Sequence, residues 1–203
     1  MQLLPESMTE NIFNFIDFKK GSYVADIGCG SGGHLRLLKE AGINAVGVEL
    51  SEAKYNALRA EGLNAVLADA VKLSFDKESF DGIVCSVVAP YVDEEKLVAE
   101  FSRILKIGGE IRASYHGFGY ALGMMSAGSI RTRFYGMRML LNTVFYRITG
   151  NRISGWMGDT LCQSPRRMDV YYKKHGLNLI SQSVSSYYLK QPVIIYHHLV
   201  KKG

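Results

Sequence analysis

An acid and a group of glycines near the start of the chain have the spacing of a ligand-binding turn. The stretch VADIGCGSGGH (24–34) places Asp26 ahead of four glycines within six residues. Glycines leave backbone N–H groups bare and let another molecule approach the main chain closely. An apolar run precedes these glycines, and a helical pattern, HLRLLKEAG (34–42), follows them. A strand, a glycine turn and a helix in this order predict a cradle for a nucleotide-like ligand.

Two further acids end the next predicted strands, Glu49 in NAVGVEL (44–50) and Asp69 in NAVLAD (64–69). The pattern Gly28-x-Gly30-x-x-Gly33, with Glu49 about 20 residues later, also fits a dinucleotide fingerprint. A nicotinamide enzyme is therefore one alternative. Asp26 argues against it, because a carboxylate there repels a pyrophosphate but receives an ammonium group. Asp69 is suitably placed to accept a hydrogen bond from an exocyclic amine.

The elements that must position these residues alternate between strand and helix from residue 20 to 115. Strands are predicted at 22–28, 44–50, 64–69, 80–86 and 109–115, and helices at 33–42, 51–62 and 93–109. This alternation predicts an α/β fold with a doubly wound, mostly parallel, Rossmann-like sheet. Two more alternating segments, 177–185 and 192–202, predict an antiparallel pair that completes the sheet. We expect a single domain over residues 1–203, with an amphipathic helix at 7–20.

Five segments in register resemble the class I S-adenosylmethionine-dependent methyltransferases. They are ADIGCGSG (25–32), GVELS (47–51), ADA (68–70), FDGIVCSVVAPYV (80–92) and RILKIGG (103–109). One departure is Ile107, which stands where the family usually has proline. The resemblance implies S-adenosylmethionine as cofactor, and we expect no metal.

The resemblance also implies roles for residues around the glycine turn. Gly28, Cys29 and Gly30 would lie against the methionine part of the cofactor through their backbones. Asp26 would position its amino group, directly or through water. Ser86, at the end of the fourth strand, would lie near the sulfonium.

The nucleoside part of the cofactor is assigned to the next strand ends by the same resemblance. Glu49 would accept hydrogen bonds from both ribose hydroxyls, because a carboxylate has two acceptor oxygens. Leu50 and Ala70 would flank the adenine, and Asp69 would accept from its amine. The alternative for Asp69 is a purely structural capping role.

Candidates for the acceptor end follow the fourth and fifth strands. Methyl transfer from a sulfonium is a direct displacement, so the enzyme mostly aligns acceptor and methyl. A base is needed only where the acceptor carries a proton at neutral pH. A carboxylate carries none there, so it needs no base. His116 is the candidate base, because imidazole has an ordinary pKa near 6.5. Tyr91 and Tyr115 are further candidate catalytic residues.

The segment 117–167 replaces a short crossover and is predicted to be a helical cap that binds the acceptor. Its clearest element is a helix from Ser129 to Gly150. One apolar stripe is predicted to face the core: Ile130, Phe134, Met137, Leu141, Val144, Phe145 and Ile148. A second face is expected to line a pocket, meet a second subunit or touch a membrane surface: Tyr135, Met139, Asn142 and Tyr146.

Charge is divided unevenly along the chain. Residues 1–115 hold 12 Lys/Arg and 17 Asp/Glu, whereas residues 116–203 hold 12 and 2. The basic half favours an anionic partner, although a solvated basic surface gives the same pattern. We therefore expect a small acceptor that is aromatic or carboxylate-bearing. RNA methylation, a catalytically silent cofactor-binding partner and a peripheral enzyme on lipid are the alternatives.

Other features of the sequence indicate which partners and which cellular compartment to expect. Ala89-Pro90-Tyr91 lacks the Asp or Asn that precedes Pro-Pro in amino-methylating nucleic-acid enzymes, so we expect no nucleic-acid partner. Cys29, Cys85 and Cys162 fit neither a disulfide framework nor a metal site. The N-terminus lacks the pattern of a signal peptide. These features predict a cytoplasmic protein.

Overall fold

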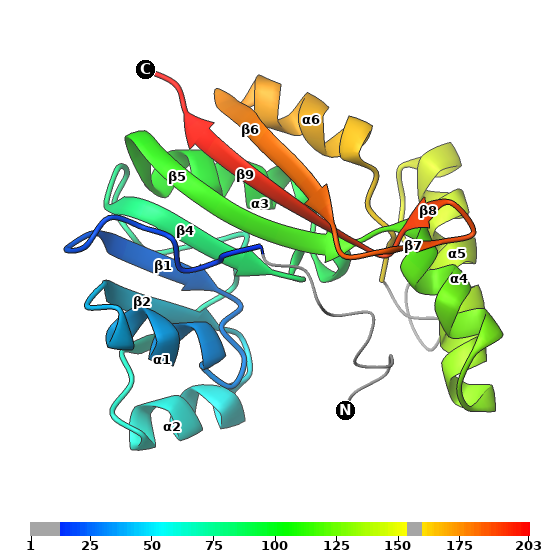
Figure 1. Ribbon diagram of the computed structural model, residues 1–203, viewed down its shortest axis with the longest axis horizontal. Helices are drawn as coiled ribbons and strands as arrows, with labels where there is room; N and C mark the ends of the chain where they lie inside the picture. Colours follow the sequence, from blue (N-terminus) through cyan, green and yellow to red (C-terminus); the bar gives the residue numbers. More distant parts are fainter. Residues whose placement is uncertain (1–12, 154–159) are drawn as a thin grey trace.

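The computed structural model of the protein describes residues 13–153 and 160–203 (Figure 1). The strands in these ranges are Tyr23–Ile27 (β1), Asn44–Glu49 (β2), Ala65–Leu67 (β3), Phe80–Ser86 (β4), Leu105–His116 (β5), Leu177–Val184 (β6), Tyr187–Tyr188 (β7), Gln191–Pro192 (β8) and Ile194–Lys201 (β9). The helices there are Gly33–Glu40 (α1), Glu52–Ala60 (α2), Glu94–Ile104 (α3), Phe118–Ser126 (α4), Ile130–Thr149 (α5) and Pro165–Lys174 (α6), with a 3-10 turn at Ala89–Tyr91 (η2).

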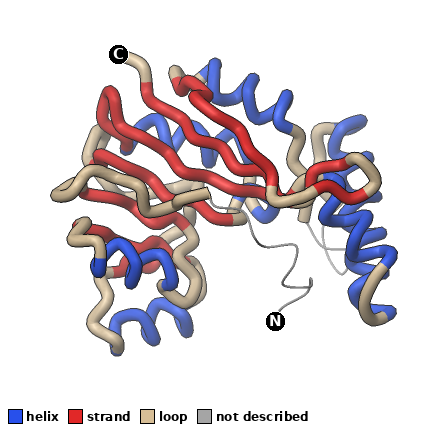
Figure 2. The backbone as a smooth tube through the Cα atoms, viewed as in Figure 1, coloured by secondary structure: helices blue, strands red, loops and turns tan. Residues whose placement is uncertain are grey.

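One seven-stranded sheet organises the described chain, in the order β3-β2-β1-β4-β5-β9-β6. The first five strands of this order pair in parallel, and β9 runs antiparallel to both of its neighbours. Figure 2 shows these seven strands as one twisted sheet flanked by helices, with the β7–β8 hairpin apart from it. The predicted doubly wound, Rossmann-like sheet with an antiparallel strand near its end is therefore confirmed.

Alternation along β1 explains how the two faces of the sheet are covered. Val24 packs with Leu38 of α1 on one face. Ala25 and Ile27 point to the other face and pack in the main core with α3 and α6. Because successive side chains of a strand point to opposite faces, Asp26 lies on the α1 side.

The predicted helix at 93–109 is shorter in the structure. It begins after Asp93, whose carboxylate accepts hydrogen bonds from the main-chain nitrogens of Glu95 and Lys96, as a helix N-cap does. The helix ends at Ile104, and β5 starts at the next residue. Gly108, with φ +77°, lies within the strand.

The cap projects beyond the carboxyl end of β5, at one end of the molecule (Figure 1). The predicted helix at 129–150 is confirmed as α5, with Ser129 accepting from the Thr132 nitrogen and Gly150 ending it in the left-handed region. The stretch with no clear period at 117–128 forms α4, which lies against the β7–β8 hairpin. Within the described residues, no helix is both long and apolar enough to cross a membrane.

The predicted orientation of α5 is wrong. Met139, Asn142 and Thr143 are buried, whereas the apolar stripe expected in the core is exposed. The opposite side of α5 is buried because it packs closely against α4 and forms hydrogen bonds with residues 160 and 162. A Cβ on Gly136 would lie 2.5 Å from the carbonyl oxygen of Ala121 in α4. Asn142 donates to the Thr160 carbonyl, and Thr143 Oγ1 accepts from the Cys162 nitrogen.

The predicted amphipathic helix at 7–20 is wrong over the part that the structure describes. Residues 13–20 form turns and irregular chain, and residues 7–12 lie outside the described ranges. Phe15, Ile16 and Phe18 still bury apolar surface against the core on the α1 side. The sequence predicted an amphipathic segment here, but its described residues are not helical.

Candidate active site

The glycine turn after β1 is tied to the end of β2 by hydrogen bonds. The nitrogens of Gly28 and Cys29 both donate to the Val48 carbonyl, at 2.8 and 3.0 Å. Gly28 and Gly30 have positive φ, where glycine avoids the strain that a side chain causes. A Cβ on Gly28 would lie 2.3 Å from Val88 Cγ2, so the turn also packs against the segment that follows β4.

Glu49 is buried at the end of β2 and faces this turn. Its Oε2 accepts from the Gly30 nitrogen at 2.9 Å, and its Oε1 accepts from the Ser51 nitrogen at 2.8 Å. Each carboxylate oxygen has acceptor capacity for another donor. The two backbone donors fix the carboxylate while leaving it able to accept from a pair of ligand hydroxyls.

Asp26 supplies a buried negative group on the same side. The residue is 1% exposed, and its Oδ2 has no hydrogen-bond partner among the described residues. His34 Nδ1 lies 3.8 Å from the other carboxylate oxygen. Burial raises the pKa of Asp26, and the neighbouring His34 opposes that rise. A buried carboxylate oxygen without a donor fits the ammonium group of a bound ligand.

The third acid, Asp69, follows β3. Its Oδ1 accepts from the Val71 nitrogen at 3.0 Å and closes a turn; no helix begins in residues 68–79, so Asp69 caps no helix there. Ala68 donates from its nitrogen to the Glu49 carbonyl, which sets this segment directly beside the end of β2. Leu50 is 69% exposed there and Ala70 is buried. The predicted adenine contacts of Leu50, Asp69 and Ala70 stay predictions.

Ser86 ends β4 and lies beside β5. Its Oγ is 3.2 Å from Ser114 Oγ, and residues 86 and 114 are paired in the sheet. Ser114 is in turn paired with Tyr196 of β9. The Tyr196 ring stacks on Phe13, with ring centroids 5.1 Å apart.

An aromatic group that sequence reasoning missed lies over this side of the sheet. Phe15 contacts both the His34 ring and the Tyr196 ring, with centroids 4.8 and 6.0 Å apart. His34 connects the group to Asp26. The position of His34 directly after the glycine turn was a signal in the sequence that could have placed it near Asp26. Tyr196 had no such signal, because it reaches this group only through the pairing of β9 with β5.

Two predicted catalytic residues lie apart from this group. Tyr115 is buried in the main core on the other face, with its hydroxyl 2.8 Å from His197 Nε2. Burial raises its pKa well above the ordinary value. Tyr91 belongs to η2 and lines a separate hollow with Tyr146 and Arg152 of the cap. No described contact joins either residue to the glycine turn, and their catalytic roles stay predictions.

His116 ends β5 at the entrance to the cap. Its ring stacks on Tyr120, with centroids 3.7 Å apart and planes 5° apart. The side chain is buried, and its Nδ1 has no hydrogen-bond partner among the described residues. Burial lowers the pKa of His116 to about 3, so the imidazole is neutral at physiological pH and a weak base. Its predicted role as a base stays a prediction.

A buried ion pair connects α6 to the start of α3. Glu94 is fully buried, and Arg167 Nε and Nη2 donate to its two carboxylate oxygens at 2.7 and 2.6 Å. Gln163 donates to the same carboxylate at 3.0 Å. In the structure the charge of Arg167 is matched by Glu94.

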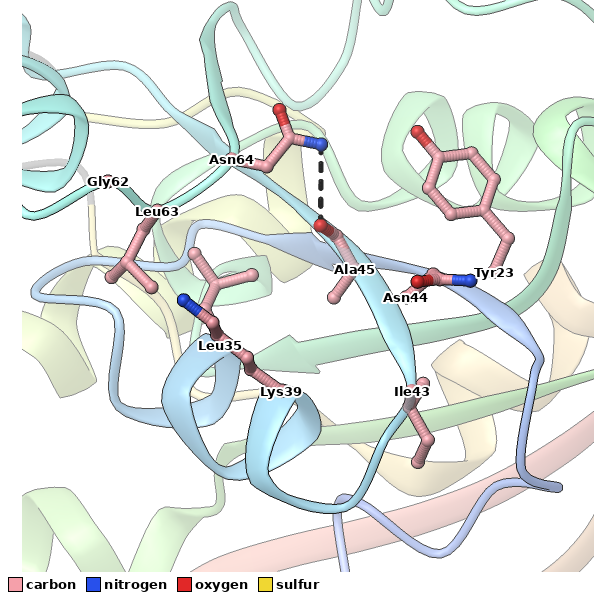
Figure 3. A pocket seen from close by; sticks show the side chains of 9 residues that line it. All are labelled: Tyr23, Leu35, Lys39, Ile43, Asn44, Ala45, Gly62, Leu63 and Asn64. Atoms are coloured by element: carbon pink, nitrogen blue, oxygen red, sulfur yellow. Dashed lines mark hydrogen bonds between the residues drawn. The ribbon is translucent and has the colours of Figure 1, made fainter.

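The pocket in Figure 3 lies at the amino ends of β1 and β2, opposite to the glycine turn. It has a volume of about 490 Å³ and is lined by Tyr23 and Asn44, the first residues of β1 and β2. The Asn64 side chain crosses it and donates to the Ala45 carbonyl at 3.4 Å. Ligands of open α/β sheets bind beyond the carboxyl ends of the strands. We therefore do not assign this pocket to the cofactor.

Comparison with known proteins agrees with this geometry. Residues 25–113 match the family model described as "Methyltransferase domain". A 24-methylenesterol C-methyltransferase 2 from Arabidopsis thaliana is 33% identical over 111 residues, which are 49% of this chain and 30% of the relative. A probable tRNA methyltransferase 9B from Homo sapiens is 30% identical over 97 residues, 46% of this chain and 21% of the relative.

The fold is shared with solved structures. A SAM-dependent methyltransferase from Methanosarcina mazei superposes with a TM-score of 0.69 at 17% identity, covering 91% of this chain and 94% of that one. The chain spans less than half the length of the curated relatives it matches.

Residues 25–113 therefore form a methyltransferase domain of the class I, S-adenosylmethionine-dependent type. The cofactor of this class fits the described residues. Asp26 provides an unpartnered oxygen for its ammonium group, and Glu49 provides acceptors for its ribose.

Proposed function

We propose that this domain transfers a methyl group from S-adenosylmethionine to a small organic acceptor that carries a carboxylate. The observation that carries the proposal is the pairing of Asp26 and Glu49 around one glycine turn. One carboxylate is buried with an open oxygen, and the other is held by two main-chain donors. Bound S-adenosylmethionine supplies a methyl group on a positively charged sulfur, and the protein holds and orients the two reactants.

A cavity beyond the carboxyl end of β5 supports an anionic acceptor. It has a volume of about 720 Å³ and lies between α4, the start of α6 and β8. Arg147 and Arg166 both line it. Arginine binds carboxylates through two parallel hydrogen bonds. Gln163, also in its wall, is 1% exposed and has an Oε1 without a described hydrogen-bond partner.

The state of His116 supports an acceptor that needs no base. A carboxylate is already deprotonated at neutral pH. If one of its oxygens accepted the methyl group of the bound cofactor, an ester and a neutral thioether would form, with no proton to remove. A buried imidazole with a pKa of about 3 takes up a proton poorly. A phenol or alcohol acceptor requires a stronger base than this histidine provides.

RNA methylation is the competing proposal, because several relatives are named as tRNA methyltransferases. Single-stranded nucleic acid is usually bound by a charged groove with aromatic residues along it. Here the exposed apolar stripe beside the cap arginines is mostly aliphatic, with Phe134 and Phe145 as its two aromatic residues. This arrangement favours RNA less than it favours a small acceptor.

Two measurements test the proposal. S-adenosylhomocysteine should raise the melting temperature and NADH should not, because a ligand that binds only the folded state stabilises it. Labelled S-adenosylmethionine should then transfer its methyl group to members of a panel of small carboxylic acids. Cofactor binding with no transfer to any acid would instead support the silent partner. Tight RNA binding that survives physiological salt would support RNA methylation.

A substitution in the cavity connects the activity to the proposed acceptor site. Arg147→Gln should lower kcat/KM for the acid at least about tenfold, because one charge-assisted hydrogen bond is lost. Its affinity for S-adenosylhomocysteine should stay unchanged. Arg59→Gln, at an exposed arginine of α2, is the matched control. Equal effects of the two substitutions would remove Arg147 from the acceptor site.

A further inference from the structure

One side of α5 exposes a continuous apolar surface. Ile130 and Ile148, near its two ends, are 80% and 79% exposed, and Leu141 between them is 49% exposed. We call this surface the outer face of α5, and its members are Ile130, Phe134, Met137, Leu141, Val144, Phe145 and Ile148. Their spacing places them along one side of a 20-residue helix, which is about 30 Å long.

Packing of the cap does not require this surface. The opposite side of α5 already contacts α4 through Gly136 and the segment after residue 160 through Asn142 and Thr143. Met125 of α4 extends the apolar area, and with Ile130 and Met137 it lines a hollow of about 460 Å³. Contiguous exposed apolar surface of this kind marks an interaction site.

The charge around the outer face selects the kind of partner. Residues 116–158 contain five arginines and no Asp or Glu. Arg131 and Arg133 line the apolar hollow itself. A second copy of the chain, placed symmetrically on this face, would set these positive charges against each other, with Asp159 as the one acid in each cap (117–167). A partner surface that is both negatively charged and apolar complements the arginines as well as the apolar side chains of the outer face of α5.

We propose that the outer face of α5 docks on the surface of an anionic lipid bilayer. The helix lies along the interface, with its apolar side chains in the boundary between headgroups and acyl chains and its arginines on the lipid phosphates. Figure 1 shows α4 and α5 at one end of the molecule, set apart from the sheet, so this end can meet a flat surface. The inference rests on exposure and charge in the cap and is independent of the proposed acceptor.

Vesicle flotation tests the proposal with the full chain. Vesicles of phosphatidylcholine with phosphatidylglycerol should bind the protein, and vesicles of phosphatidylcholine alone should bind it at least about tenfold more weakly. Leu141→Asp and the neutral Leu141→Gln should both lower binding to the anionic vesicles. Val170→Asp should not, because Val170 is similarly exposed, at 61%, but on α6. The double substitution Arg131→Gln/Arg133→Gln should weaken binding to the anionic vesicles alone.

Several outcomes would overturn the proposal. One is an absence of binding to the anionic vesicles, and another is an equal loss in Leu141→Asp and Val170→Asp. A dimer in light scattering that Leu141→Asp dissociates, without lipid binding, would assign the face to a second copy. The melting-temperature shift with S-adenosylhomocysteine should be the same in every variant. That control verifies the fold and separates failure of this proposal from failure of the proposed function.

Discussion

Glu49 Oε2 accepts a hydrogen bond of 2.9 Å from the main-chain nitrogen of Gly30. This contact joins the end of β2 to the glycine turn that follows β1. One carboxylate therefore both organises the turn and faces the place where the ribose of the cofactor is expected. Changes at Glu49 should affect the geometry of the turn as well as the contacts to the ligand.

Glu49→Ala should weaken the binding of S-adenosylhomocysteine at least about tenfold. The ribose hydroxyls lose a charged acceptor, and such hydrogen bonds are worth about 1.5–3 kcal/mol. The melting temperature should also fall, because the nitrogens of Gly30 and Ser51 lose their partner. Isothermal titration calorimetry and thermal unfolding measure the two effects. Glu52→Ala, at an exposed acid of α2, is the control, and equal affinities in the two variants would contradict the assignment.

Gly28→Ala should destabilise the glycine turn and weaken cofactor binding. The new methyl group would lie 2.3 Å from Val88 Cγ2, and the residue has φ +71°. Strain and overpacking of this kind typically cost about 1–3 kcal/mol. Gly33→Ala is the matched control, because its Cβ would meet nothing within 4 Å. Urea unfolding of both variants should show a loss in the first only.

Arg167→Met should be strongly destabilising, by about 3–5 kcal/mol, because it leaves the carboxylate of Glu94 buried with its charge unmatched. Glu94→Gln combined with Arg167→Met should recover much of that loss, since the charge is then removed from both sides. Denaturant unfolding of the single and double variants provides a double-mutant cycle. Additive losses would show that the two residues act independently, despite the distances of 2.6 and 2.7 Å between them.

The sequence predicted the sheet and the acids at its strand ends because those signals are local. Asp26, Glu49 and Asp69 each follow a short apolar run, and the first two also lie beside a glycine turn or a helix start. A strand and the turn after it are close in the chain, so their relative positions follow from backbone geometry. The hydrogen bond between Gly30 and Glu49 depends only on the parallel pairing of β1 with β2, which are consecutive strands in the chain.

The orientation of α5 and the Glu94–Arg167 pair could not be predicted in the same way. Periodicity shows that α5 has an apolar side, but the side that is buried depends on which neighbours approach it. Here Gly136 allows α4 to approach closely, and Asn142 satisfies a carbonyl of a distant segment. Glu94 and Arg167 are 73 residues apart, and only the packing of α6 against α3 brings them together.

His116→Phe should leave kcat within a few-fold of the wild type if the acceptor is a carboxylate. Phenylalanine keeps a ring that can stack on Tyr120, so the substitution removes the nitrogens with little change in packing. The pH profile of kcat should also lack an ascending limb near pH 6.5, because burial lowers the pKa of His116 to about 3. A fall of about 10²–10⁴ in kcat would instead support the base role and a protonated acceptor.

Folding stability should decrease as the pH is lowered below about 6.5, because two histidines are buried in the neutral form. Burial lowers the pKa of His116 to about 3 and that of His197 to about 4. Both values lie below the ordinary pKa of about 6.5 in the unfolded chain. At pH values between the lowered and the ordinary pKa of each histidine, the unfolded state binds a proton that the folded state does not. Each histidine should therefore reduce the free energy of unfolding by about 1.4 kcal/mol per unit of falling pH.

His197→Phe provides the test of this pH dependence. The variant should be less stable near neutral pH, because His197 has hydrogen-bond partners in Tyr115 and Gln182. Between pH 6 and pH 5, above the usual range of carboxyl groups, its stability should nevertheless fall about half as steeply as that of the wild type, since only one of the two histidines remains. Urea unfolding at a series of pH values measures both slopes. Identical slopes would mean that His197 takes up its proton in the folded protein and is less shielded from water than its position in the core indicates.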